Sequence, residues 1–144
     1  MRPLRVVRVY SRNAENRSAF ADRARADLAL DATAVNSAED AVAGADLVIV
    51  ATRSQTPVLD AAAIEPGAHV VTVGPKFASA HELPLELADR ASVITSDSPE
   101  QAASYPDRYP LFLAGTPLFS LNEKWPGLVA ARSGQYRPEG AVMT

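Results

Sequence analysis

Two short apolar runs, at residues 47–51 and 69–73, most restrict the folds that this chain can adopt. The first is Leu-Val-Ile-Val-Ala without interruption, and the second follows a Pro-Gly turn at 66–67 and contains three valines before Gly74. Each run is too short for a helix, and the first lacks the alternation of apolar and polar residues that marks a strand with one wet face. Strands covered on both faces have this composition, which predicts a parallel sheet enclosed by helices. Sheets of this kind bind ligands just beyond the carboxyl ends of their strands.

Length and composition indicate one globular domain over residues 1–144. The chain is 47% hydrophobic and 22% charged, and its net charge of −3 gives no electrostatic reason to expect nucleic acid or a membrane as a partner. It has no cysteine, which excludes disulfides and thiolate metal sites. No apolar run approaches the ~20 residues that span a bilayer. We therefore expect a cytoplasmic protein.

Capping signals divide the chain into alternating strands and helices. Asn13, Ser37 and Asp60 are predicted N-caps, and a capping-box pattern at 79–82 predicts a helix that continues to about residue 91. A further helix is expected to begin after Ser98. The expected strands cover residues 6–10, 32–35, 47–51, 69–73 and 93–95. This order predicts parallel βαβ units with right-handed crossovers.

The first unit of a dinucleotide-binding sheet is missing from this pattern. Such a sheet opens with a strand, a G-x-G-x-x-G turn and a helix whose N-terminus holds the pyrophosphate, but no G-x-G occurs here. The strand at 6–10 therefore corresponds to the second strand of such a domain. Without the first strand, two unpaired edges face each other. We expect residues 6–10 to pair directly with 47–51; alternatively, a second copy of the chain or another partner chain fills the gap.

The segment from about 105 to 144 differs from the rest of the chain. It is rich in proline and contains most of the aromatic residues. Packing against the sheet and a protein interface are the two interpretations of these aromatic residues.

Several motifs at a consistent spacing connect the chain to a known family. They lie at 9–13, 45–52, 57–59 and 66–74, with further similarity at 82–84 and 97–101. Over roughly residues 4–130 this set resembles the ornithine cyclodeaminase/mu-crystallin family. The resemblance implies an incomplete Rossmann-like α/β domain, with a mostly parallel sheet and helices on both faces, in a cytoplasmic and usually dimeric NAD(P)-dependent protein. The family's catalytic residues fall before Met1 and after Thr144 in that pattern, so none is assigned to this chain.

Two functions are compatible with this resemblance. The first is dinucleotide binding in the metabolism of amino acids or cyclic imines, by deaminating cyclisation or imine reduction, in a chain that is catalytically incomplete by itself. The second is a non-enzymatic truncated paralogue that acts as a binding or oligomerisation module. Binding of a dinucleotide distinguishes the two.

The predicted cofactor site lies where strands end. Ser11, Arg12 and Asn13 follow the strand that meets the adenosine ribose, where an arginine accommodates a 2′-phosphate, so we expect NADP(H) to be favoured over NAD(H). The alternative is a solvated turn that caps a helix. Small residues at the other strand ends let a cofactor approach the backbone, or are ordinary strand ends. The residues expected on this nicotinamide side are Ala51, Thr52, Arg53, Val73 and Gly74.

No metal site or enzymatic nucleophile is predicted. His69 and His81 have no second ligand at metal-binding spacing, so we expect both to be structural or surface residues. No G-x-S-x-G pattern marks a serine nucleophile. Asp97 is expected to favour the entry of a helix, with contact to a ligand as the alternative.

Overall fold

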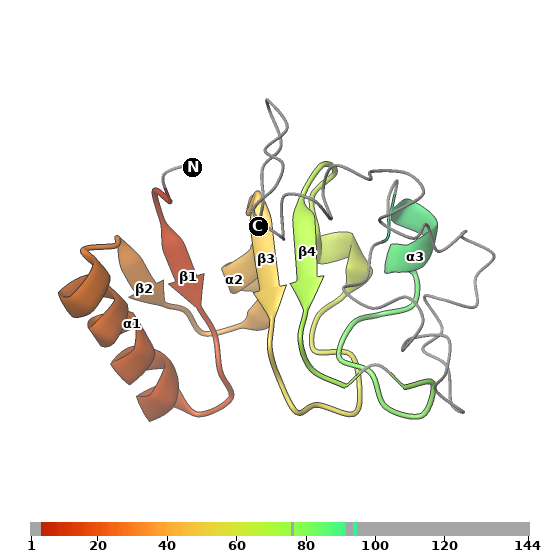
Figure 1. Ribbon diagram of the computed structural model, residues 1–144, viewed down its shortest axis with the longest axis horizontal. Coiled ribbons are helices and arrows are strands. Elements are labelled where there is room, and N and C mark those ends of the chain that lie inside the picture. The colour runs from red at the N-terminus through yellow and green to blue at the C-terminus, as the bar shows by residue number, and fades with distance from the viewer. Residues whose placement is uncertain (1–3, 76, 92–93, 95–144) are drawn as a thin grey trace, which may run out of the picture.

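The computed structural model describes residues 4–75, 77–91 and 94 (Figure 1). The expected strand at 93–95, except for Ile94, the helix after Ser98 and the segment 105–144 lie outside the described residues, as does Asp97. The predicted alternation of strands and helices is confirmed as far as the fourth strand. In chain order the elements are β1 (Val7–Val9), α1 (Ala14–Leu28), β2 (Ala32–Ala34), α2 (Ala38–Val42), β3 (Leu47–Val50), the 3₁₀ turn η1 (Ala61–Ala63), β4 (His69–Thr72) and α3 (Leu87–Arg90).

The strands form two parallel pairs rather than one continuous sheet. β1 pairs with β2, and β3 pairs with β4. Figure 1 shows the spatial order β2-β1-β3-β4, and β1 and β3 are not hydrogen-bonded to each other. The predicted direct pairing of residues 6–10 with 47–51 is therefore wrong. The helix α2 lies against both pairs, because it contacts β1 and also packs through Val42 into the core beside β3.

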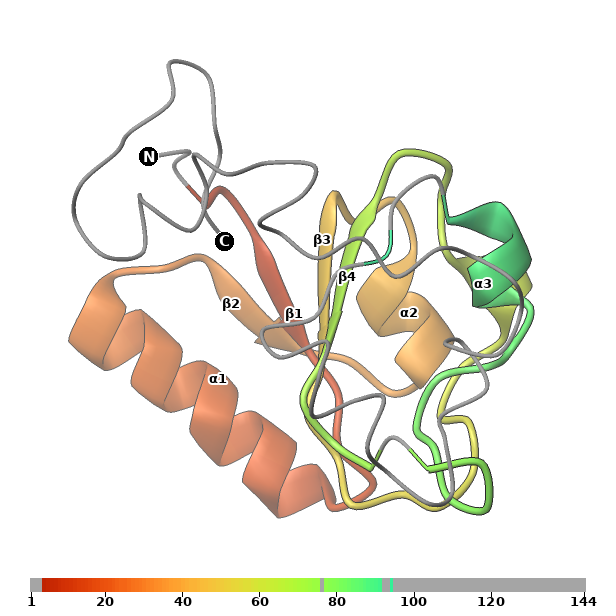
Figure 2. The same cartoon turned by 45° about the vertical axis from the view of Figure 1, so that its right-hand side comes forward.

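Helices lie on opposite faces of the strands. α1 covers β1 and β2, whereas α2 lies on the other side (Figure 2). The three predicted N-caps are confirmed, because each side chain accepts a hydrogen bond from an amide in the first turn of its helix. These capping side chains are Asn13 for α1, Ser37 for α2 and Asp60 for η1.

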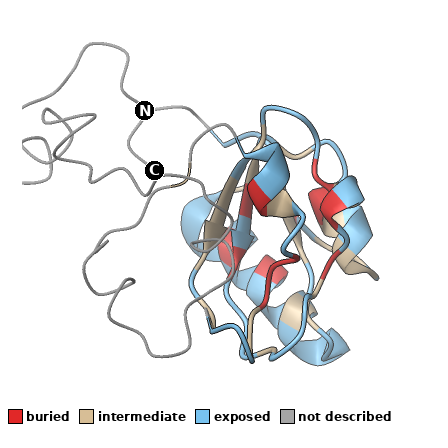
Figure 3. Ribbon diagram, turned by 90° about the vertical axis from the view of Figure 1, so that its right-hand side faces the viewer, coloured by how far each residue is buried: buried red, intermediate tan, exposed pale blue. Residues whose placement is uncertain are grey.

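Buried side chains gather in two separate clusters. One lies between α1 and its strands and consists of Ala21, Ala24 and Ala32. The other lies beside β3 and β4, and part of it is visible among the buried positions in Figure 3. Its members are Val42, Val48, Val50, Leu59, Ile64 and Leu83.

The strand β3 buries only one of its faces. Val48 and Val50 are buried, but Ile49 between them is 64% exposed. The predicted coverage of this strand on both of its faces is therefore wrong among the described residues, although helices lie on both sides of the strands as a whole, as predicted. The reason is that α1 packs on β1 and β2 and leaves the Ile49 side of β3 uncovered.

The helix predicted from 79 to about 91 is reduced to α3, which begins only at Leu87. The preceding loop is held to the segment after β3 instead. Its backbone pairs with residues 55–58, because the amide of His81 donates to the Gln55 carbonyl at 3.3 Å and the Val58 amide donates to the Glu82 carbonyl at 3.0 Å. These long-range hydrogen bonds prevent the local capping box from starting a helix.

Candidate functional site

The carboxyl ends of β3 and β4 meet at the side chain of Glu82, which is completely buried. Its Oε2 atom accepts hydrogen bonds from the amide and the hydroxyl of Thr52, both at 2.7 Å. Its Oε1 atom accepts from the hydroxyl of Thr72 at 2.6 Å, the amide of Val73 at 3.1 Å and the amide of Gly74 at 2.6 Å. Oε2 therefore binds the end of β3 and Oε1 binds the end of β4, so the carboxylate joins the two strand ends.

These hydrogen bonds keep Glu82 ionised. Burial raises the pKa of its carboxyl, but the hydrogen bonds from Thr72, Thr52 and the backbone outweigh burial and hold the pKa below the ordinary value. All five partners are donors, and an ionised carboxylate is a pure acceptor with about four lone-pair sites. Because those sites are occupied, Glu82 cannot serve as a proton-transferring group for a substrate.

Close packing around the carboxylate requires glycine at position 74. A Cβ atom there would overlap the carboxylate of Glu82 and the carbonyl oxygen of Thr52. The need for glycine here is steric, because φ of Gly74 does not lie in the left-handed region, unlike φ of Gly44 and Gly67. Gly74 thus allows Glu82 to reach both strand ends.

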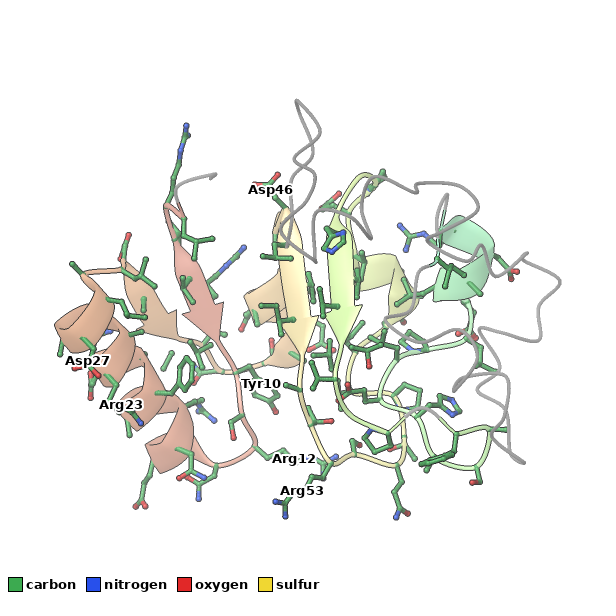
Figure 4. All side chains as sticks on the ribbon, viewed as in Figure 1. Tyr10, Arg12, Arg23, Asp27, Asp46 and Arg53 are labelled. Carbon is green, nitrogen blue, oxygen red and sulfur yellow. The ribbon has the colours of Figure 1, made fainter. Side chains whose placement is uncertain are left out.

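The end of β1 lies on the same edge as the ends of β3 and β4. Arg12 Nη2 donates to Ser54 Oγ at 3.4 Å, which connects the two strand pairs. Figure 4 shows the exposed side chains of Arg12 and Arg53 on this edge. Arg8, further up β1, makes a second connection by donating to the carbonyl of Ala43.

The structure brings the two predicted groups of site residues together at the carboxyl ends of β1, β3 and β4, which we call the rim. Several of their polar groups already have hydrogen-bond partners. The Asn13 side chain caps α1, and the carbonyl of Ser11 accepts from Arg17 at 3.0 Å. The amides of Thr52, Val73 and Gly74 all point to Glu82. The exposed side chains of the set that remain for a ligand are those of Arg12, Ala51, Arg53 and Val73.

The pattern at 79–82 predicts a helix start and does not reveal the role of Glu82. Two signals could have found it. Pro84 argues against a helix at this point, and threonine hydroxyls stand at the ends of both apolar runs, at Thr52 and Thr72. A single acidic residue near such a pair of donors is a candidate for a buried acceptor.

Among the residues that the structure describes, no three histidine, aspartate or glutamate side chains are grouped so that they could hold a metal ion. His69 and His81 are not buried, and His81 Nδ1 lies 3.3 Å from the carbonyl oxygen of Phe77. In the same described ranges no helix is long and apolar enough to cross a membrane.

Comparison with known proteins identifies the family. The model of the ornithine cyclodeaminase/mu-crystallin family matches residues 1–111. The chain belongs to this family. The ornithine cyclodeaminase/mu-crystallin resemblance inferred from the motifs is thereby confirmed.

Relatives in this family support the fold. The ketimine reductase mu-crystallin of Mus musculus is 32% identical over 114 residues, which are 79% of this chain and 34% of that protein. A probable ornithine cyclodeaminase from Bordetella pertussis superposes with a TM-score of 0.65 at 29% identity, covering 77% of this chain and 34% of the other. Δ1-Pyrroline-2-carboxylate reductase from Thermococcus litoralis, solved with NADH and L-proline, gives a TM-score of 0.59 at 30% identity over 63% of this chain and 28% of that one.

These matches confirm the Rossmann-like α/β fold, and they cover only part of each relative. The chain spans about a third of the length of the curated relatives that it matches.

Proposed function

We propose that this chain supplies part of an NAD(P)(H) site on the rim formed by the carboxyl ends of β1, β3 and β4. The observation that carries the proposal is the hydrogen bond from Arg12 to Ser54, which joins the ends of β1 and β3. Cationic side chains at Arg12 and Arg53 and apolar ones at Ala51 and Val73 are exposed together there. Phosphates and a ring stacked on apolar side chains are the complementary ligand groups. A relative crystallised with NADH supports the same cofactor class.

We further propose that NADP(H) binds more tightly than NAD(H), through Arg12 and the 2′-phosphate. A charge-assisted hydrogen bond contributes about 1.5–3 kcal/mol, so Arg12→Ala should lower NADPH affinity about tenfold or more and leave NADH affinity almost unchanged. Calorimetric titration of the full chain with both cofactors measures this. Arg23→Ala is the matched control, because Arg23 lies on α1 in an exposed ion pair with Asp27. Equal affinities of the unmodified chain for NADPH and NADH would contradict the preference.

The associated chemistry is proposed to be that of amino acids or cyclic imines, by imine reduction or deaminating cyclisation. We assign no catalytic residue to this chain. Glu82, the carboxylate at the strand ends, is saturated by five donors and cannot transfer a proton. The acid–base groups would therefore come from another segment or chain, while this chain positions the cofactor.

A second candidate function, an oligomerisation module, is favoured by two strand edges, one of β1 and one of β3, that have no partner strand among the described residues. The Val7 amide donates to the carbonyl of Asp31, and the Val9 carbonyl accepts from the amide of Val35, so both residues bond on the β2 side. Because the sides alternate along a strand, the amide and the carbonyl of Arg8 face β3. The carbonyls of Asp46 and Val50 accept hydrogen bonds from amides of residues 69 and 73. Because successive residues of a strand point their peptide groups to opposite sides, the amide and the carbonyl of Ile49 face β1. Between these edges a strand from a second copy of the chain would find donors and acceptors on both sides.

This second function is tested by light scattering over a range of protein concentrations. A homodimer that Ile49→Pro converts to a monomer supports it, because proline removes a donor from the gap side only. Ile49→Val retains the amide and should remain dimeric. A monomer at every concentration contradicts this function and leaves the dinucleotide site unaffected.

A further inference from the structure

We propose that the buried carboxylate of Glu82 makes the nicotinamide side of this rim selective for the oxidised, positively charged cofactor over the reduced one. The inference rests on the proposed function, because it needs a nicotinamide ring on the ends of β3 and β4. It goes beyond that function by assigning specificity to a residue that does not touch the ligand.

The position of the carboxylate relative to the surface supports the proposal. The ladder between β3 and β4 ends with the hydrogen bond from the Val73 amide to the Val50 carbonyl at 2.9 Å. Beyond it, Glu82 joins the strand ends. The Val73 amide is also 3.1 Å from Glu82 Oε1, while the side chain of the same residue leaves it 63% exposed. A ring resting on Val73 would be separated from the negative charge by the thickness of one residue.

The hydrogen bonds to Glu82 also determine what the ring would meet. The amides of Thr52, Val73 and Gly74 donate to the carboxylate, so these amides are not available to the ligand, and the exposed Val73 side chain is. A carboxylate beneath that side chain favours a positive charge above it. A nicotinamide ring is cationic when oxidised and neutral when reduced, so only the oxidised form gains from this field.

The cation next to Thr52 in the sequence, Arg53, does not cancel this effect. Arg53 follows Thr52 directly, but its side chain is exposed, so water and salt screen its charge. Glu82 is completely buried. Among the residues that the structure describes, the ion pairs lie on α1 and do not include Glu82. Within the described part of the chain, its charge is therefore offset by hydrogen-bond dipoles and not by a counter-ion.

The test measures the affinities of the full chain for NADP⁺ and NADPH by calorimetry. The unmodified chain should bind NADP⁺ more tightly, and Glu82→Gln should reduce the ratio of the two affinities about tenfold, the size expected from removing one buried charge. Glu82→Asp keeps the charge and should keep the ratio even if both affinities fall. Glu86→Gln is the matched control, because this exposed residue precedes α3 and its side chain makes no capping hydrogen bond.

Each outcome decides the proposal. The proposal is supported if the ratio of NADP⁺ affinity to NADPH affinity falls in Glu82→Gln and is retained in Glu82→Asp. If Glu82→Gln lowers both affinities by the same factor, Glu82 has a structural role only and the proposal is overturned. If Glu82→Gln does not fold, tighter binding of NADPH than of NADP⁺ by the unmodified chain still overturns it. Binding of neither cofactor by the unmodified chain rejects the proposed dinucleotide site, and this inference with it.

Discussion

Two regions of the described chain, residues 4–35, here called the first half, and residues 36–91, here called the second half, are stabilised in different ways. The first half has a buried core of three alanines, and its helix α1 leaves Phe20 and Leu28 more than half exposed. The second half buries six larger aliphatic side chains and one ionised carboxylate. Buried alanine removes little apolar area from water, so the first half depends on its helix cap and on local geometry.

Because of this difference, the strand ends that form the rim are not held equally firmly. The ends of β3 and β4 are held by Glu82 on top of a packed core, whereas the end of β1 reaches them through the hydrogen bond from Arg12 to Ser54. Arg12, the proposed contact of the 2′-phosphate, thus lies on the weakly packed half, and Ala51 and Val73, the proposed contacts of the ring, lie on the well-packed half. Substitutions in each half test this contrast.

The largest effect is expected from removing a core side chain of the second half. Leu83 is 4% exposed in the larger cluster, so Leu83→Ala should lower the free energy of unfolding by about 2–5 kcal/mol. Ala24→Gly in the first half should cost only about 1 kcal/mol, chiefly through helix propensity. Urea denaturation of both variants measures the contrast. Similar losses would show that the two halves do not differ in packing.

Gly74→Ala tests the close approach of Glu82 to the strand ends. The new methyl group would overlap the Glu82 carboxylate and the Thr52 carbonyl, so a loss of about 1–3 kcal/mol is expected. Gly44→Ala is the control, because that site has open space and only a positive φ of 63°. It should cost about 1 kcal/mol in thermal or urea denaturation. A larger cost at Gly44 than at Gly74 would contradict the proposed packing around Glu82.

Acid should weaken the second half through Glu82. Because the folded-state pKa of its carboxyl is lowered, its contribution to stability is present above the unfolded-state pKa of about 4.3 and is lost as the pH falls through the lower folded-state value. Urea midpoints measured from pH 6 downward should therefore decline less steeply below about pH 4.3 in Glu82→Gln than in the unmodified chain. Glu86→Gln should retain the original slope, and an identical decline in all three would exclude this assignment.

A smaller effect is expected from the N-cap of the first half. The Asn13 side chain accepts from the Asn16 amide at 2.9 Å, so Asn13→Ala should lower stability by about 1 kcal/mol and increase hydrogen exchange in α1. Asn16→Ala makes the same chemical change but keeps the backbone donor of that bond. It should leave the exchange of α1 nearly unchanged, and equal effects of both variants would argue against the cap.

The smallest effect is a gain in stability. The C-cap of α1 is Ala29, which has a φ of 52° in the left-handed region that favours glycine. Ala29→Gly removes this strain but adds freedom to the unfolded chain, so a net gain of about 0.5 kcal/mol is expected. Ala26→Gly within α1 should instead cost about 1 kcal/mol. A loss of thermal stability in Ala29→Gly would contradict the assigned strain.

Local signals were sufficient for much of the fold. Asn13, Ser37 and Asp60 cap their helices as predicted, because a capping side chain and the amide that it accepts from lie two or three residues apart. The apolar runs at 47–51 and 69–73 form neighbouring parallel strands, and the family resemblance is confirmed by the match over residues 1–111. Such features depend on neighbouring residues, so they can be recognised in a single sequence.

Tertiary structure decided the features that depend on distant groups. The pattern at 79–82 is a capping box by local criteria, yet Glu82 turns inward because five donors from Thr52 and residues 72–74 stabilise its charge better than one helix amide could. Likewise, β1 pairs only with β2 and β3 only with β4 among the described strands, although the composition of both segments would allow β1 and β3 to pair. Sequence patterns specify which segments become strands and helices. The partners of a buried charge and of a free strand edge are settled only when those segments meet in space.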